Sequence, residues 1–412
     1  MAPLPSSMLK SCKRTAIAED TSVAHRPNVR GDWDDRVMGS GNTAKLHHYV
    51  PQSYLRGFAT EKERITAIPL DRSRLRFTAS VRNVAAQTHF HTVPEAEEPD
   101  GFEKILSAVE GEAADIIRRI EAGEFPLPEK DRNSLSFYLA LQAVRGPDTR
   151  RTMEQLQAKM VRIEVGAGGR KNVKRWIKKN LGFDATDEQA QRIWDEATQP
   201  GGPPITFATI EHIKHMVETA EELAKYLFTR PWLLVRFDRR SLITCDAPVS
   251  LIRNARDENH WEGVGFGTAW GVATPLTRKL GLLMTDPMVI IERLEGDDPM
   301  IQKVRSTVVS GSADRVEVGT TAMEQLFNDH TAESAREYIY CHPDDERFVP
   351  ETLHEPRLVN MEMRGFTEAE FSGEPWFPSP DDEPRSTRSP RSSDPAGAGT
   401  AEEREAVITD AQ

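Results

Sequence analysis

Cysteines are scarce in this sequence, and long apolar runs are missing from it. The 412 residues include three cysteines, an odd number with no C-x-x-C pair, which argues against a disulfide framework and against a thiolate zinc site. No stretch approaches the roughly 18 apolar residues of a membrane span, and the N-terminus lacks the apolar run of a secretory signal. We therefore expect reduced thiols, a cytoplasmic location and no membrane partner.

Apolar residues are also few, and the two ends of the chain account for the deficit. The hydrophobic share is 38%, below the roughly 45–50% of globular domains. Residues 1–43 have little apolar periodicity, and residues 367–412 are rich in proline, serine and acidic side chains. Neither segment can bury enough apolar surface to offset the entropy of ordering it. We expect disordered N- and C-terminal tails on either side of a single domain at residues 44–345.

The most distinctive segment is His47-His48-Tyr49-Val50-Pro51-Gln52-Ser53-Tyr54-Leu55-Arg56-Gly57-Phe58. This segment resembles the opening signature of the bacterial domain of unknown function 4238 family. Further segments follow in that family's order: Arg82-Asn83-Val84, His89-Phe90-His91, Gln142-Ala143-Val144-Arg145, Cys245-Asp246-Ala247-Pro248-Val249 and Asn328. The resemblance covers about residues 45–342. It implies no activity, since the family's own name states that none is established.

The rhythm of apolar residues predicts strands and then helices in the first part of the domain. Residues 64–70 and 75–81 alternate with the two-residue period of half-buried strands and are expected to form a β-hairpin. Apolar residues then recur at helical spacing over 102–120, after a capping-box pattern at Asp100 and Glu103. A second helix, apolar on several sides and therefore buried, is predicted from Glu129 to about Arg145.

The rest of the domain is predicted to continue with helices and to return to strands. Four helices are expected in residues 146–230, which form either a helical insertion or subdomain or an integral half of the core. Next come a hairpin of 232–237 with 241–244, strands at 249–252, 268–274, 280–284 and 288–291, a helix at 321–336 and a last strand at 337–341. Strands, then helices, then strands predict an α+β fold with an antiparallel or mixed β-sheet and a large central helical section.

Positive charge gathers in residues 145–179, although the whole chain has a net charge of −12. Eleven Lys or Arg residues face three acidic residues there, and acidic residues then dominate positions 184–222. Because clustered basic side chains can neutralise phosphates, Lys174 and Arg175 are candidate binding residues for nucleic acid or for an acidic protein. In the alternative interpretation, the basic and acidic segments pair with each other.

His47 and His48 are the first candidate catalytic residues. Imidazole titrates near neutral pH and can serve as an acid, a base or a metal ligand. Adjacent side chains on a strand point to opposite faces, so only one of the two histidines can reach a given site. Gln52 and Arg56 of the same segment are candidate binding residues. The alternative is that the histidines form hydrogen bonds within the core.

Three further polar residues lie where strands or helices are expected to end. Asp246 follows a short strand and precedes Ala247-Pro248, so it is either a catalytic base or metal ligand, or a residue that satisfies backbone donors in a turn. Arg145 emerges at a Gly-Pro break and could clamp a phosphate or carboxylate, pair with Asp246 or cap helix carbonyls. Asn328 is a catalytic candidate that could orient a substrate or a histidine, or bond locally.

Metal-site spacing is weak throughout, and the sequence identifies no cofactor. His89 with His91, on one strand face, and His212 with His215, on one helix face, could each donate two ligands. Neither pair is flanked by the acidic third ligand of a known motif. We therefore predict no metal ligands.

Two hypotheses of different classes follow, and whether the protein is an enzyme stays open between them. In the first, His47 or His48, Asp246, Arg145 and Asn328 form a hydrolase-like site for a phosphate-containing or nucleic-acid substrate. This hypothesis requires the side chains to converge, because acid–base chemistry needs hydrogen-bond reach. In the second, the protein is a non-catalytic binding module. Its basic helical stretch docks an acidic partner or nucleic acid, and the motif residues serve the fold.

Overall fold

The structure of the chain is a computed structural model that describes residues 46–94, 96–254, 263–286, 298–359 and 371–376. The predicted tail at 1–43, most of the predicted tail at 367–412 and the predicted strand at 288–291 lie outside these residues. Helices and mixed sheets make up the described part, so the α+β prediction is confirmed. None of the helices in these ranges is long and apolar enough to cross a membrane.

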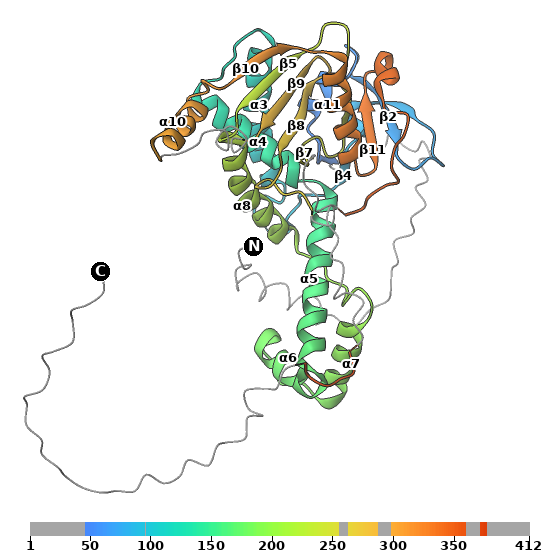
Figure 1. The fold of residues 1–412 in the computed structure, drawn as a ribbon. Helices are drawn as coiled ribbons and strands as arrows, with labels where there is room; N and C mark the ends of the chain where they lie inside the picture. The colour runs from blue at the N-terminus through green and yellow to red at the C-terminus, as the bar shows by residue number, and fades with distance from the viewer. Residues whose placement is uncertain (1–45, 95, 255–262, 287–297, 360–370, 377–412) are drawn as a thin grey trace, which may run out of the picture.

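A five-stranded sheet forms the central layer (Figure 1). Its strand order is β10-β5-β9-β8-β7, and every pairing is antiparallel except that of β10 with β5. The strands are β5 (Trp232–Arg236), β7 (Ser250–Ile252), β8 (Gly271–Thr277), β9 (Leu280–Thr285) and β10 (Arg315–Val318). The strands predicted at 249–252, 268–274 and 280–284 are confirmed, whereas β10 was not predicted.

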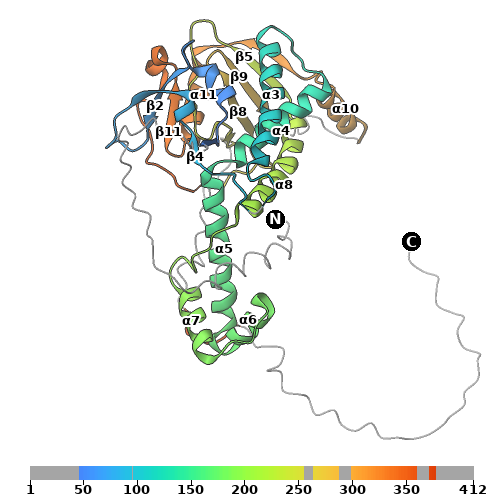
Figure 2. The same cartoon turned by 180° about the vertical axis from the view of Figure 1, so that it is seen from behind.

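Three long helices cover one face of the central sheet, and Figure 2 shows them from behind. They are α3 (Gly101–Glu121), α4 (Glu129–Val144) and α8 (Thr209–Phe228). Side chains along β5 alternate between the two faces, as a strand requires. Trp232 and Leu234 pack with the helices, whereas Leu233 and Val235 pack with the core on the other side. The burial predicted for the 129–145 helix is confirmed.

The opposite face of the central sheet packs against α11 (Thr321–Ser334) and a second sheet. This antiparallel sheet has the order β3-β2-β11-β6. Its strands are β2 (Arg64–Pro69), β3 (Phe77–Ser80), β6 (Thr244–Cys245) and β11 (Tyr338–Cys341). The predicted hairpin of 64–70 with 75–81 is therefore confirmed.

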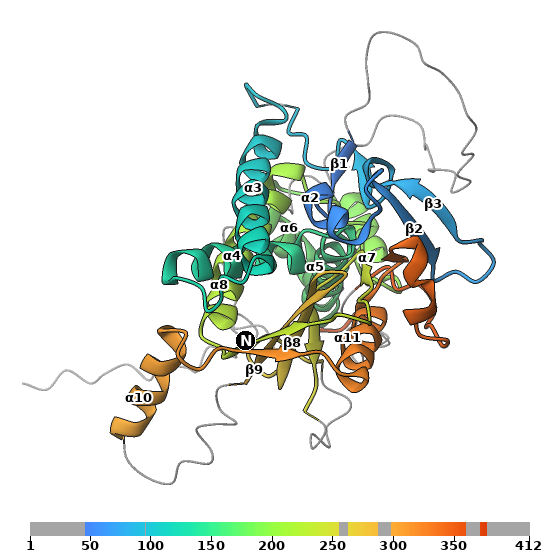
Figure 3. The ribbon, with the colours of Figure 1, turned by 90° about the horizontal axis from the view of Figure 1, so that it is seen from above.

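Shorter elements complete the described body. Strands β1 (Leu46–His48) and β4 (Ala86–Thr88) pair antiparallel. The short helices are α2 (Gln52–Leu55), η1 (Arg56–Phe58), η2 (Val81–Asn83) and η4 (Pro343–Phe348). Helix α10 (Asp298–Val309) lies at the margin of the body when the molecule is viewed from above (Figure 3).

The predicted hairpin of 232–237 with 241–244 is wrong. Strand β5 pairs with β9 and β10, whereas residues 244–245 pair with β11 in the other sheet. The reason is that the backbone between them is bound elsewhere. Asn328 accepts a hydrogen bond from Ile243 N (3.0 Å) and donates one to Ser241 O (3.2 Å), and Leu242 N donates to Arg278 O (2.8 Å).

A helical arm projects from the body (Figures 1 and 2). It consists of α5 (Pro147–Gly168) with η3 (Arg170–Asn172), α6 (Val173–Leu181) and α7 (Asp187–Thr198) gathered at its far end. These elements share a small core of their own. The four helices expected in residues 146–230 are present, but the fourth, α8, packs in the body rather than in the arm.

Arg132 of α4 is fully buried and ties the helices to the central sheet. Its Nε donates to Phe228 O (3.0 Å) at the end of α8, and its Nη2 donates to Arg230 O. Its Nη1 pairs with the Asp314 carboxylate, which also accepts from Trp232 N (2.9 Å) at the start of β5. Burial raises the pKa of Asp314 and lowers that of Arg132, so each charge depends on the other.

We predict that Arg132→Leu lowers the free energy of unfolding by about 3–5 kcal/mol, because it leaves the Asp314 carboxylate buried without its charge partner. Urea unfolding followed by circular dichroism measures this loss. Lys130→Leu is the matched control, since Lys130 is exposed on the same helix and should change stability by at most about 0.5 kcal/mol. Equal losses in the two variants would contradict the role of the buried ion pair.

Candidate metal centre

Strand pairing places His47 beside the chain that follows β4. His47 lies opposite Gln87 in the β1–β4 ladder, and β4 ends one residue later at Thr88. The backbone then turns at His89, whose φ of 54° is in the left-handed region. This turn brings His91 N within 3.0 Å of His47 Nδ1, to which it donates a hydrogen bond.

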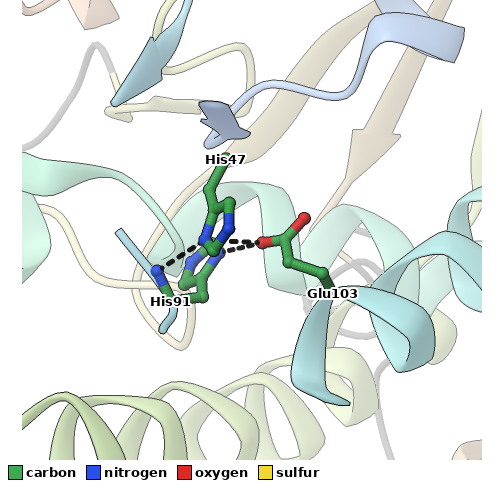
Figure 4. A group of neighbouring side chains, drawn as sticks. All are labelled: His47, His91 and Glu103. Atoms are coloured by element: carbon green, nitrogen blue, oxygen red, sulfur yellow. Dashed lines mark hydrogen bonds and ion pairs between the residues drawn. The ribbon is translucent and has the colours of Figure 1, made fainter. Parts of the chain in front are cut away.

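Glu103 completes a cluster of three side chains (Figure 4). It lies in the first turn of α3, and its Oε1 is 2.6 Å from His91 Nδ1 and 3.5 Å from His47 Nδ1. His47, His91 and Glu103 can each offer one ligand atom within 4.8 Å of the other two. The capping box predicted from Asp100 and Glu103 is not formed, since the Asp100 side chain makes no cap hydrogen bond and Glu103 pairs with His91.

The hydrogen bonds assign the protons of the two imidazoles. His47 Nδ1 accepts from a backbone N–H, so the proton of the neutral ring is on Nε2, which lies 3.5 Å from Asp100 Oδ1. His91 Nδ1 donates to the Glu103 carboxylate, so its Nε2 keeps a free lone pair. Within the described residues, neither His47 Nε2 nor His91 Nε2 has a hydrogen-bond partner, and both atoms are buried.

Burial and charge keep His91 and Glu103 in the forms that bind metal. Burial lowers the pKa of His91, although the Glu103 carboxylate partly opposes this effect. Burial alone would raise the pKa of Glu103, but the hydrogen bond from His91 and the nearby His47 and Arg145 lower it. The His91 imidazole is therefore neutral and the Glu103 carboxyl is ionised at neutral pH, as metal ligands must be.

Comparison with known proteins places the chain in a family. A scan against protein families matches residues 46–345 to the family described as "Protein of unknown function (DUF4238)". The chain belongs to this family. Neither the search of curated proteins nor the search of solved structures found a match.

Arg145 and His48 form hydrogen bonds next to the cluster but are not part of it. Arg145 is buried, donates to His48 O and pairs through Nη1 with Glu110 Oε1 at 2.9 Å. Both terminal nitrogens of its guanidinium are thus bound within the protein, which favours a structural role over the predicted anion clamp. The His48 ring contacts Gln52 Nε2 at 3.4 Å, and burial lowers its pKa. As expected for neighbours on a strand, His48 is not part of the cluster that His47 forms.

Asp246 is not joined to this cluster by any hydrogen bond or ion pair within the described ranges. Its carboxylate accepts backbone N–H groups from Arg336 (2.7 Å), Glu337 (2.7 Å) and Tyr338 (3.0 Å), just where β11 begins. Burial raises its pKa to about 6, although these three donors partly offset the shift. The catalytic role stays a prediction for Asp246, and its contacts favour the structural alternative.

Asn328 is likewise held by the fold. Its side chain is 1% exposed and bonds to Ile243 N, Ser241 O, Glu324 Oε1 and Phe348 O. The convergence of His47, Asp246 and Asn328 that the first hypothesis requires has no support in these contacts.

Arg56, Lys174 and Arg175 lie at the surface, and two of them form ion pairs. Arg56 pairs with Glu63 (2.8 Å), and Lys174 pairs with Asp187 (2.7 Å). Arg175 is exposed on the same helix as Lys174. Other basic residues of 145–179 also pair within the chain, as Lys178 does with Asp184 (2.7 Å). These contacts favour the interpretation that the basic and acidic segments neutralise each other.

The sequence identified His91 as a possible ligand but paired it with His89 instead of with His47 and Glu103. His89 and His91 were expected on one strand face, yet β4 ends at Thr88 and the His89 ring is exposed. His212 was paired with His215, but its ring is fully buried against Phe90. Glu103 was missed as a ligand because its position at a helix start is typical of a cap. Only the tertiary contact identifies it.

We predict that Asp246→Ala lowers the free energy of unfolding by about 3 kcal/mol, since three backbone donors lose their acceptor. Chemical denaturation measures the change. Asp238→Ala is the control, because Asp238 is an exposed aspartate in a loop of the same region. A fully stable Asp246→Ala variant would show that the carboxylate is dispensable for the fold and would restore the catalytic interpretation.

We also predict that His212 makes the protein sensitive to acid. Burial lowers its pKa to about 3 from an ordinary value of 6.5, so the folded state holds it neutral. The unfolded chain takes up a proton below pH 6.5 that the folded chain does not. Stability present above that pH is therefore lost as pH falls, by about 1.4 kcal/mol per pH unit.

The measurement is the free energy of unfolding at pH 7.5 and pH 5 for the wild type and for His212→Leu. The comparison uses each protein's own change between the two pH values, which removes any effect of the substitution that does not depend on pH. We expect a smaller change in the variant. An equal change would assign the acid sensitivity to other groups, such as His48 and His91.

Proposed function

We propose that the protein is a metal-dependent hydrolase with its metal centre at His47, His91 and Glu103. The observation that carries this proposal is the convergence of two imidazoles and a carboxylate within 4.8 Å. Two histidines and one carboxylate are the ligand set of many catalytic zinc sites, which keep a position open for water or substrate. The proposal retains His47 from the sequence-based hypothesis and replaces Asp246 and Asn328 by His91 and Glu103.

The unpaired ring nitrogens support a metal ion over a purely structural cluster. Buried polar atoms almost always have a partner, and an orphaned atom calls for an explanation such as an ion. Both Nε2 atoms, on His47 and His91, are buried without a hydrogen-bond partner in the described part of the chain. With the protons placed as above, His91 Nε2 carries a buried, unsatisfied lone pair, and a divalent cation satisfies it.

The exposure of the cluster fixes the side from which a substrate would approach. The His47 and His91 side chains are 3% and 0% exposed, whereas those of Asp100 and Glu103 are 23% and 28% exposed. The carboxylates therefore form the solvent side of the centre. Asp100, next to His47 Nε2, is placed to accept a proton on this side, and a bound metal would supply an activated water.

The substrate class that we propose is a phosphate-containing molecule, nucleic acid included. Metal centres of this kind polarise the phosphoryl oxygen and lower the pKa of bound water, which is the chemistry that phosphate-ester hydrolysis requires. The alternative, a binding module that docks an acidic partner through 145–179, has less support because Lys174 and Lys178 of that stretch are bound to Asp187 and Asp184.

We predict one tightly bound zinc-type ion per chain. After chelation and dialysis, titration calorimetry with Zn²⁺ should give a stoichiometry near one. His91→Ala or Glu103→Gln should weaken binding at least about 100-fold, since even partners outside the ligand shell change metal affinity by about 10–100-fold. His89→Asn is the matched control. It removes the neighbouring imidazole outside the cluster, and asparagine tolerates the left-handed backbone at this position.

Hydrolysis is tested on the zinc-loaded chain with a nitrophenyl phosphate diester and with labelled single-stranded DNA and RNA. We expect activity in the wild type and in His89→Asn, and loss of activity in His91→Ala. Zinc binding without hydrolysis of any of these substrates would overturn the enzyme proposal and favour the binding module. Hydrolysis that survives in His91→Ala would place the active site elsewhere.

A further inference from the structure

A short segment of the C-terminal region lies against the far end of the arm. Residues 371–376, Phe-Ser-Gly-Glu-Pro-Trp, fall within the region predicted to be disordered. In the structure Phe371 packs against the small core that α5, α6 and α7 share. The arm core is distinct from the cores of the body, so the segment binds to the arm and not to the body.

Main-chain hydrogen bonds hold the segment in its middle and at its C-terminal end. Arg170 N, just beyond α5, donates to Gly373 O at 2.7 Å. Trp376 N donates to Ala167 O, in the last turn of α5, at 2.9 Å. Helix ends leave carbonyl and N–H groups without intrahelical partners, and here the segment satisfies one of each kind. Main-chain hydrogen bonds also contribute to the affinity of folded domains for extended peptides.

Two aromatic rings supply the apolar part of the contact. Phe371 and Trp376 stack on each other with ring centroids 5.3 Å apart and an angle of 27° between their planes. The guanidinium of Arg162 lies 4.9 Å from the centre of the Phe371 ring. The Ser-Gly-Glu-Pro sequence between the rings lets the segment fold back so that both rings meet over α5.

Two glycines of the arm make room for the segment. A Cβ atom on Gly166 would lie 2.4 Å from the Phe371 ring, and one on Gly169 would lie 2.5 Å from Pro375 N. Gly169 also has a φ of +78°, which disfavours other residues. Gly168, by contrast, has nothing within 4 Å of an added Cβ. The two glycines that contact the segment are thus the ones that need to be small.

We propose that the arm tip is a peptide-recognition site and that residues 371–376 of the same chain are its resident ligand. The partner that fits this site is a peptide with two aromatic residues on either side of a Gly-Glu-Pro turn. The covalent link makes this contact intramolecular, so the resident segment competes with a separate partner peptide at a high effective concentration. A partner peptide therefore binds only when the segment is released, and the arm is closed to other peptides in the isolated chain.

The test uses a fluorescent peptide of residues 369–378 and full-length protein, with fluorescence anisotropy as the readout. Phe371→Ser/Trp376→Ser releases the resident segment and leaves the site intact. We expect this variant to bind the peptide at least tenfold more tightly than the wild type. Adding Gly166→Ala to this variant should weaken its binding of the peptide at least tenfold, because the new methyl group occupies the place of the Phe371 ring.

Gly168→Ala, added to the same double variant, is the matched control and should leave peptide binding unchanged. Both substitutions replace glycine by alanine in α5, which favours the helix, so unfolding of the arm does not explain a loss of binding. Circular dichroism checks the helix content of each variant. Equal binding by the wild type and the released variant, or equal effects of Gly166→Ala and Gly168→Ala, would overturn the proposal.

Light scattering of the wild type decides whether the segment binds in its own chain. A monomer at all concentrations supports the assignment. A concentration-dependent dimer that disappears in Phe371→Ser/Trp376→Ser would overturn it, because the segment would then occupy the arm of a second copy.

Discussion

The buried guanidinium of Arg132 is the interaction on which the body of the protein depends. It joins α4, the end of α8, the start of β5 and the residue before β10 through one charged group. Asp314 pairs with it and also accepts from Trp232 N, and the Trp232 ring lies 4.3 Å from the guanidinium. These polar contacts hold the helical layer and the central sheet in one relative position, in addition to the apolar packing between them.

A second buried arginine, at the other end of α4, connects this frame to the candidate metal centre. Arg145 donates to His48 O in β1 and pairs with Glu110 in α3. The same two elements carry His47 and Glu103, two of the three proposed ligands. The position of the centre therefore follows from α4, which holds β1 and α3 from one side while the β1–β4 ladder brings in His91.

The sequence predicted the parts of the fold whose signals are local and could not predict those that depend on distant partners. The two-residue rhythm of 64–70 and 75–81 is enough to predict β2 and β3, because each strand finds its partner next to it in the chain. Residues 232–244 carry the same rhythm, yet Asn328, some 85 residues away, binds the backbone of 241–243 and prevents the hairpin.

The candidate site shows the same limit in its chemistry. Glu103 stands where a capping residue would stand, and nothing within four residues of it distinguishes a cap from a ligand. His91 is 44 residues from His47, and their contact requires both a strand pairing and a left-handed turn at His89. Local patterns therefore identified histidines that matter but not the group that they form.

The contacts of Asp246 explain why this residue can matter to the protein without touching a substrate. Its carboxylate fixes the backbone of residues 336–338, and the Arg336 side chain then pairs with Asp148 at 2.8 Å, in the first turn of α5. Arg151, one turn further along α5, lies 3.5 Å from Glu337. The base of the arm is thus anchored through the turn that Asp246 holds. Because α5 carries the proposed peptide-recognition site at its other end, we expect a change at Asp246 to alter the orientation of the arm.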